Sequence, residues 1–157
     1  MDLVIRKMKI EEYPLLNEFL YNAIFIPKGV EPPSKEIIKT PELELYIKNF
    51  GKCNDDNALV AELDGNVVGA VWTRIMDDYG HIDDSTPSLA ISIFKEYRNK
   101  GIGTSLMKEM LKLLQQKYYK RVSLSVQKAN YAVSMYKKLG FRIFEENEQE
   151  YIMICDL

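Results

Sequence analysis

The segment of residues 88–118 constrains the fold more than any other, because its pattern changes from strand to helix across a glycine-containing turn. Leu89, Ile91 and Ile93 alternate with small or polar residues, and branched apolar residues at period two are typical of a half-buried strand. Over residues 102–114 apolar residues recur at three- and four-residue steps, which predicts an amphipathic helix. The segment therefore predicts a strand followed directly by a helix.

The turn between these two elements reads Arg98-Asn99-Lys100-Gly101-Ile102-Gly103-Thr104. Its glycines permit positive φ or close approach of a ligand to the backbone, and Thr104 lies at the predicted helix entry. A helix start carries unpaired N–H groups and partial positive charge, so this turn predicts a site for phosphate oxygens. Its spacing fits neither the P-loop nor the dinucleotide fingerprint. A tight connection that binds nothing is the alternative interpretation.

The order of strand, R-x-x-G-x-G and amphipathic helix resembles the acetyl-CoA-binding motif of the GNAT superfamily of N-acyltransferases. A second apolar strand follows at Val122, Leu124 and Val126. After it, NYAVSMYKKLGF at residues 130–141 is similar to a second segment of that family, with Asn, Ala, Tyr, Lys and Gly-Phe in the same order. The two motifs cover roughly the second half of the chain, while the first half agrees only in its pattern of elements.

The resemblance implies a mixed α/β fold: a twisted, mostly antiparallel sheet of six to seven strands, splayed between its two central strands and flanked by about four helices. The residues add an opening strand over 3–7 and a helix with Ile10, Leu15, Leu16, Phe19 and Leu20 on its apolar face. They also predict a hairpin turn at 64–66 and closing strands at 141–145 and 151–156. At 157 residues, the chain is expected to form a single domain over 1–157.

Composition excludes several classes of function. A net charge of −2 gives no cationic field of the kind expected for nucleic-acid binding. No apolar run approaches the roughly 20 residues of a bilayer span, so no membrane partner is expected. The N-terminal segment does not resemble a secretory signal, which makes a cytoplasmic location the expectation. Two separated cysteines, Cys53 and Cys155, and one histidine give no metal set.

The cofactor implied by the resemblance is acetyl-CoA, with its pantetheine arm between the strands that end near Ile93 and Val126. An edge strand can bind such an arm through main-chain hydrogen bonds. The N–H groups from Arg98 to Thr104 would hold the pyrophosphate, with Arg98 or Lys100 adding charge attraction. The cofactor-binding residues implied are Ile91, Ile93, Arg98, Asn99, Lys100, Gly101, Ile102, Gly103, Thr104, Asn130 and Tyr136.

The resemblance makes Tyr136 the general acid that protonates the leaving thiolate, and a packing role for its ring is the alternative. A backbone N–H near Ile93 would polarise the thioester carbonyl. The predicted central strand has only Ala90 and Ser92 between its apolar positions, so no carboxylate base can be assigned there. The open candidates for the base are His81, Asp83, Asp84 and Glu62, with a solvated loop as the alternative for His81.

The acceptor is expected to contact the Pro- and Gly-interrupted segment of residues 23–57, whose aromatic side chains Phe25, Tyr46 and Phe50 suggest a pocket wall. Trp72 is a further acceptor candidate, although a strand tryptophan more often packs in a core. The expected activity is acetyl transfer to a primary amine of a small molecule or peptide by direct attack. The alternatives are an inactive CoA-binding sensor or a plain interaction domain. A homodimer through a sheet edge is possible.

Overall fold

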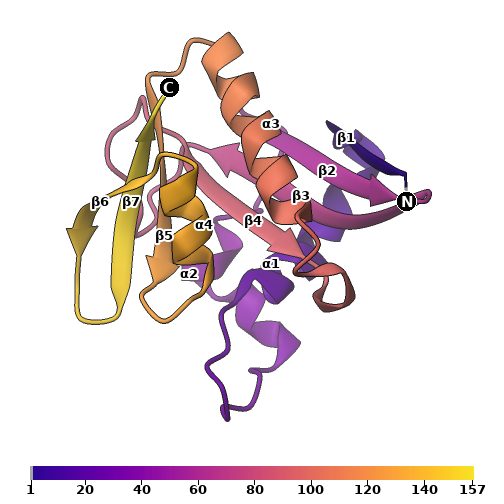
Figure 1. The fold of residues 1–157 in the computed structure, drawn as a ribbon, viewed down its shortest axis with the longest axis horizontal. Coiled ribbons are helices and arrows are strands. Elements are labelled where there is room, and N and C mark those ends of the chain that lie inside the picture. The colour runs from indigo at the N-terminus through magenta and orange to yellow at the C-terminus, as the bar shows by residue number, and fades with distance from the viewer. Residues whose placement is uncertain (1) are drawn as a thin grey trace.

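Residues 2–157, described by a computed structural model, form one sheet of seven strands. In spatial order these are β1 (Leu3–Lys7), β2 (Asn57–Leu63), β3 (Asn66–Arg74), β4 (Ser88–Ile93), β5 (Arg121–Gln127), β7 (Glu150–Asp156) and β6 (Arg142–Glu146) (Figure 1). All neighbouring strands are antiparallel except β4 and β5. The expected mostly antiparallel α/β fold is confirmed. β1 and β6 form the two outer edges of the sheet, and a homodimer that pairs through one of these edges stays a prediction.

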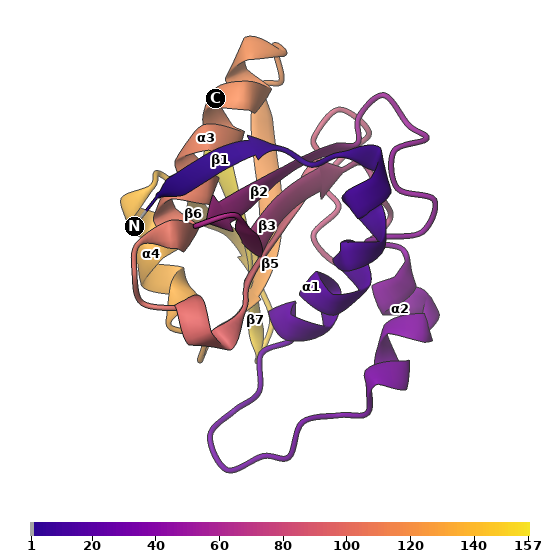
Figure 2. The same cartoon turned by 90° about the vertical axis from the view of Figure 1, so that its right-hand side faces the viewer.

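Helices cover both faces of this sheet. Figure 2 shows α3 (Ile102–Gln116) and α4 (Ala132–Lys138) on one side, with α1 (Leu16–Ala23) and α2 (Pro41–Glu44) on the other. Three short 3-10 helices complete the set in the described residues: η1 (Ile10–Leu15), η2 (Lys35–Lys39) and η3 (Lys95–Tyr97). Among residues 2–157 there is no helix with the length and apolar character needed to cross a bilayer.

Each face of the sheet has its own apolar core. On the α3 side, the helix buries most of the apolar positions expected from the sequence, with Leu111 and Leu113 only partly buried. The buried residues are Ile102, Leu106, Met107, Met110 and Leu114. On the α1 side, Phe19 and Trp72 are buried in a second cluster. A fully buried side chain of this size contributes roughly 1.5–3 kcal/mol. The sheet between the two cores is therefore held rigidly, and β4 lies near its centre.

The β2–β3 hairpin turns as its sequence predicts. Asp64 and Gly65 both have positive φ, 50° and 87°, as a two-residue type I′ turn requires. Within β3, Gly69 lies opposite an irregularity in the pairing at Ala61, and a Cβ there would lie 2.6 Å from Cδ1 of Ile93. Glycine at this position thus leaves room for the side chain of Ile93 on the neighbouring strand.

The first helical segment differs from the expected single amphipathic helix. It begins as the tight η1 turn containing Pro14, and the α-helical hydrogen bonds start only with α1. Proline has no N–H to donate, and three residues per turn rotate the apolar positions off one common face. Ile10 and Leu15 are therefore exposed, by 77% and 37%, while Leu16 and Phe19 are buried.

Candidate active site

A gap opens between the two central strands. β4 and β5 pair only at Ser88 and Ser123, where the Ser123 N–H donates to the Pro87 carbonyl at 3.0 Å. Beyond this pair the two strands diverge toward their carboxyl ends (Figure 1). The splayed sheet expected from the sequence is confirmed. The pair Ser88–Ser123 forms the closed end of the gap, and the start of α3 lies beyond its open end.

The backbone of β4 is oriented toward this gap at every second residue. The Phe94 N–H donates to the Val68 carbonyl at 2.9 Å, so the even-numbered residues of β4 make the hydrogen bonds to β3. In an antiparallel ladder the intervening residues direct their N–H and C=O groups to the other side. Ile91 and Ile93 therefore present backbone groups to the gap, as a ligand bound like an added strand would require.

The turn before α3 supplies a row of free donors. Within the described chain, the N–H groups of residues 99–104 donate to no protein acceptor. Asn99 and Gly101 have positive φ, 62° and 80°, which curls the backbone ahead of the helix. The side chain of Ile102 is buried in the core, so only its backbone can face a ligand. Thr104 is the third residue of α3, because Gly101, and not a threonine hydroxyl, occupies the helix cap.

Arg98 has a different environment from the one expected. Its Nε donates to the Ile93 carbonyl and its Nη2 to the Asn22 carbonyl, each at 2.9 Å. Its own N–H donates to the Lys95 carbonyl at 3.3 Å, so the row of free N–H groups begins at Asn99. Arg98 thus ties the end of β4 to the last turn of α1, while Lys100 is exposed and carries the positive charge nearest the free donors in sequence.

Helix α4 faces the start of α3 across the gap. A Cβ at Gly103 would lie 3.7 Å from Sδ of Met135 and 4.0 Å from Cδ1 of Ile91. On the same helix Tyr136 is 7% exposed, and its ring centroid lies 5.9 Å from that of Phe141. Burial, with a smaller contribution from Tyr131, raises the pKa of the Tyr136 phenol. Ile91, Gly103 and α4, far apart in the sequence, thus border one region.

Two other residues expected near the cofactor or acceptor already make hydrogen bonds within the protein. Asn130 accepts a hydrogen bond from the Ala132 N–H at 2.9 Å, just before α4, which leaves its amide nitrogen for other partners. Trp72 is only 1% exposed, and its indole N–H donates to the Tyr46 carbonyl at 3.0 Å. Trp72 therefore offers no surface to an acceptor here, because both its ring and its donor are used inside the protein.

The remaining acceptor candidates lie on the α1 side of the sheet. Phe25 is half-buried in the coil after α1, a segment that extends away from the sheet (Figure 2). Phe50 packs edge-on against Tyr13, 5.2 Å between ring centroids, and lies beneath the guanidinium of Arg74. Tyr46 is half-buried, and its hydroxyl donates to Oδ2 of Asp78 at 3.0 Å.

The candidate bases have different surroundings. Glu62 lies on β2, two strands from β4, where it accepts a hydrogen bond from Arg6 of β1, so it lies outside the gap. Hydrogen bonding to Arg121 lowers the pKa of Asp83 to about 2, which makes it a poor proton acceptor at neutral pH. His81 contacts the Met76 carbonyl at 2.9 Å and lies 3.4 Å from Oδ1 of Asp84, both within its own loop.

Sequence reasoning missed the polar side chains on the α1 side of the gap. The Ser88 hydroxyl donates to Oδ1 of Asp78 at 2.9 Å, and the Ser123 hydroxyl donates to the Gly80 carbonyl at 2.8 Å. The signal was present as Ser88 and Ser92 on β4 and Ser123 and Ser125 on β5, which alternate with apolar residues. Such alternation in central strands indicates one face lined by small and polar side chains.

Comparison with known proteins agrees with this geometry. The model of the "Acetyltransferase (GNAT) family" matches residues 21–141. An N-alpha-acetyltransferase of Sulfolobus acidocaldarius is 32% identical over 128 residues, covering 71% of this chain and 73% of that protein. The N-acetylaspartate synthetase of Rattus norvegicus is 33% identical over 100 residues, covering 63% of this chain but only 31% of its own length.

A solved structure shares the whole fold. The PaiA N-acetyltransferase from Thermoplasma acidophilum, crystallised in complex with coenzyme A, superposes with a TM-score of 0.74 at 23% identity, covering 100% of both chains. The splayed sheet is thus the fold of an N-acetyltransferase. The chain belongs to the acetyltransferase (GNAT) family, and it is an acetyl-CoA-dependent acyltransferase.

Proposed function

We propose that this enzyme transfers acetyl from acetyl-CoA to a primary amine by direct attack, with the cofactor arm in the gap between β4 and β5. The observation that carries the proposal is the free N–H groups of Ile91 and Ile93, which lead to unpaired N–H groups at residues 99–104. Backbone groups that face the gap at every second residue suit the amide groups of an extended pantetheine arm. The N-terminus of the 15-residue helix α3 favours the negative pyrophosphate.

The chemistry assigned to the chain has two parts. The Ile93 N–H points into the gap, and the hydrogen bond from Arg98 to the Ile93 carbonyl holds this residue in place. The N–H donor is therefore preorganised to polarise the thioester oxygen. Tyr136 donates a proton to the departing thiolate as the carbon–sulfur bond breaks. Its raised pKa keeps the phenol protonated at neutral pH, and the same burial makes the thiolate a stronger base.

The acceptor is proposed to carry a free primary amino group. The names of the two relatives indicate acetylation of α-amino groups, and the polar face beside Tyr46 and Asp78 offers acceptors of hydrogen bonds to such a group. The deciding experiment measures thiol release from acetyl-CoA across amino acids, short peptides and polyamines, beside a calorimetric titration with CoA. Amine-dependent release with binding is the expected result. Binding without release from any amine would favour the inactive sensor instead.

Substitution of Gly103 tests the placement of the cofactor. Gly103→Val is expected to lower CoA affinity about tenfold or more, because its methyl groups project between α3 and Met135 where the arm is proposed to enter, and overpacking costs about 1–3 kcal/mol. Gly65→Val, at the distant hairpin turn, is the control for a general loss of stability. Isothermal titration calorimetry measures both, and an unchanged affinity for Gly103→Val would remove the cofactor from this gap.

A further inference from the structure

A carboxylate lies at the closed end of the gap, held by two hydroxyl groups. Asp78 accepts from Ser88 through Oδ1 at 2.9 Å and from Tyr46 through Oδ2 at 3.0 Å. Ser88 is also the β4 residue paired with β5, which fixes the carboxylate beside the point where the strands separate. Each carboxylate oxygen accepts more than one hydrogen bond, so Asp78 keeps acceptor capacity for a further donor.

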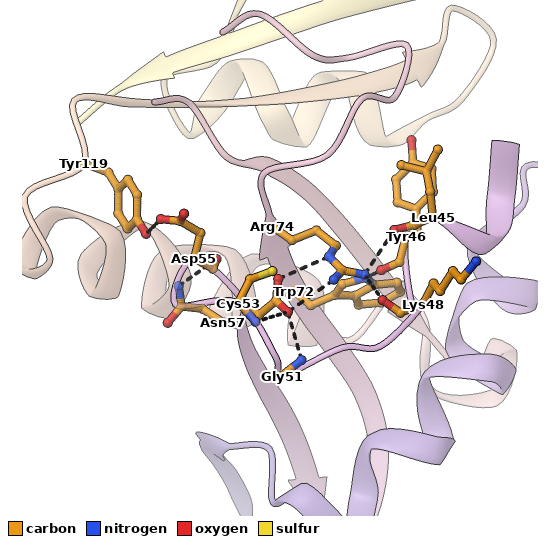
Figure 3. A network of polar contacts seen from close by, with 11 residues as sticks. Leu45, Tyr46, Lys48, Gly51, Cys53, Asp55, Asn57, Trp72, Arg74 and Tyr119 are labelled. Carbon is orange, nitrogen blue, oxygen red and sulfur yellow. Dashed lines mark hydrogen bonds and ion pairs between the residues drawn. The ribbon is translucent and has the colours of Figure 1, made fainter. Parts of the chain in front are cut away.

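The phenol that contacts Asp78 is anchored from its backbone. Arg74 donates through Nη1 to the carbonyls of Leu45, at 3.1 Å, and Lys48, at 2.9 Å, while Trp72 donates to the Tyr46 carbonyl between them. Figure 3 shows the Tyr46 ring directed away from the guanidinium of Arg74. The turn after α2 is therefore rigid, and it holds the phenol in one direction.

The charges around this phenol are negative. Burial raises the pKa of Tyr46 most, the charge of Asp78 adds to this and the Ser125 hydroxyl opposes it, while Glu150 contributes a smaller increase. These groups come from the elements that meet here: Asp78 from the loop after β3, Ser125 from β5 and Glu150 from β7. Over residues 2–157 neither carboxylate forms an ion pair with Lys, Arg or His.

We propose that Tyr46 and Asp78 bind the protonated amino group of the acceptor and so select cationic primary amines, an inference that rests on the proposed function. Asp78 supplies the negative charge, and Tyr46, a neutral phenol, supplies a second acceptor oxygen. The ammonium proton then passes through Asp78 to solvent. The freed nitrogen pair forms the bond to the thioester carbon, and the nitrogen releases a second proton to solvent. The carbon–sulfur bond breaks, and the thiolate takes its proton from Tyr136, which is reprotonated by solvent.

The test compares a charged and an uncharged form of one acceptor. A short peptide with a free α-amino group, of pKa about 7.7–8.0, is mostly cationic at pH 6.5 and mostly neutral at pH 9. With Asp78→Asn, the KM for this peptide is expected to rise about tenfold at pH 6.5, since a charge-assisted hydrogen bond is lost. At pH 9 the difference from wild type is expected to fall below about threefold, because the neutral amine gains little from the charge.

The control is Asp77→Asn, which removes the same charge from an exposed neighbour and is expected to leave KM unchanged. CoA affinity is expected to stay at the wild-type value in both variants. If Asp78→Asn does not fold, Tyr46→Phe carries the test, since it removes only the hydroxyl bonded to Asp78. Its expected effect is a threefold to tenfold rise in KM at pH 6.5.

Three outcomes would overturn this inference, and they differ. If wild type acetylates the peptide and Asp78→Asn or Tyr46→Phe has the wild-type KM at pH 6.5, the subsite assignment is wrong while the proposed function stands. If wild type binds CoA but acetylates no amine at any pH, the proposed function fails and the subsite fails with it. A rise in KM that is equal at pH 6.5 and pH 9 also contradicts the assignment, because charge would then play no part.

Discussion

Asp56→Ala is expected to destabilise the protein by about 3–5 kcal/mol, because it leaves a buried guanidinium without its counter-charge. The Asp56 side chain is 1% exposed and that of Arg74 is 8% exposed. The carboxylate accepts from Nε and Nη2 of Arg74, both at 3.2 Å, and also from the Gly51 N–H at 2.9 Å. Figure 3 shows these contacts around one carboxylate. Its loss thus leaves a charge and a backbone donor unpaired at once.

Urea denaturation measures this loss. Glu36→Ala is the matched control, because it removes a carboxylate from an ion pair with Lys39 in which both side chains are at least 70% exposed, and it should cost less than about 1 kcal/mol. The double variant Asp56→Leu/Arg74→Met, which removes both charges, is expected to recover part of the stability. A loss below about 1 kcal/mol for Asp56→Ala would mean that the pair is not as buried as described.

Tyr136→Phe is expected to lower kcat by about 100-fold to 10,000-fold, the usual contribution of a positioned proton donor. The change removes only a hydroxyl, and in the described chain that hydroxyl makes no hydrogen bond to protein, so folding and CoA affinity should be nearly unchanged. Steady-state kinetics beside a CoA titration separates these quantities. Equal kcat values for the two proteins would leave Tyr136 with packing against Phe141 as its only role.

The pH profile carries a second expectation for Tyr136. Burial raises the pKa of its phenol above the ordinary value of 10.0, so the acid form persists as pH rises toward 10. The wild-type rate should therefore show no alkaline loss from this residue below pH 10. The stability of the folded protein depends on pH in the same direction. Burial of the neutral phenol contributes fully below the pKa of the unfolded state, and its contribution is lost as pH rises through the pKa of the folded state.

The strand, turn and helix around Gly101 could be predicted because their signals are local. Period-two and helical patterns, and a glycine at positive φ, each depend on a few consecutive residues. The hairpin at Asp64 and Gly65 was predictable for the same reason. The exposure of Ile10 and Leu15 could not be predicted, because the helical period alone does not reveal that Pro14 delays the start of α1.

Much of the candidate site depends instead on contacts between distant segments. Arg98 reaches Asn22, 76 residues away, and nothing near Arg98 in the sequence indicates that its long side chain turns back to carbonyl groups. Asp78 lies in an acidic loop that resembles a solvated connection. Only the fold brings it to Ser88 and to Tyr46, which is 32 residues away.

The single pair between β4 and β5 gives this sheet four edges instead of two. Besides the outer sides of β1 and β6, two strand edges face each other inside the molecule beyond Ser88 and Ser123. Free strand edges attract any extended chain that can pair with them, and interior placement keeps these two from other proteins. The unpaired strand edges of this enzyme thus lie at its centre, where only a slender molecule can form the missing hydrogen bonds.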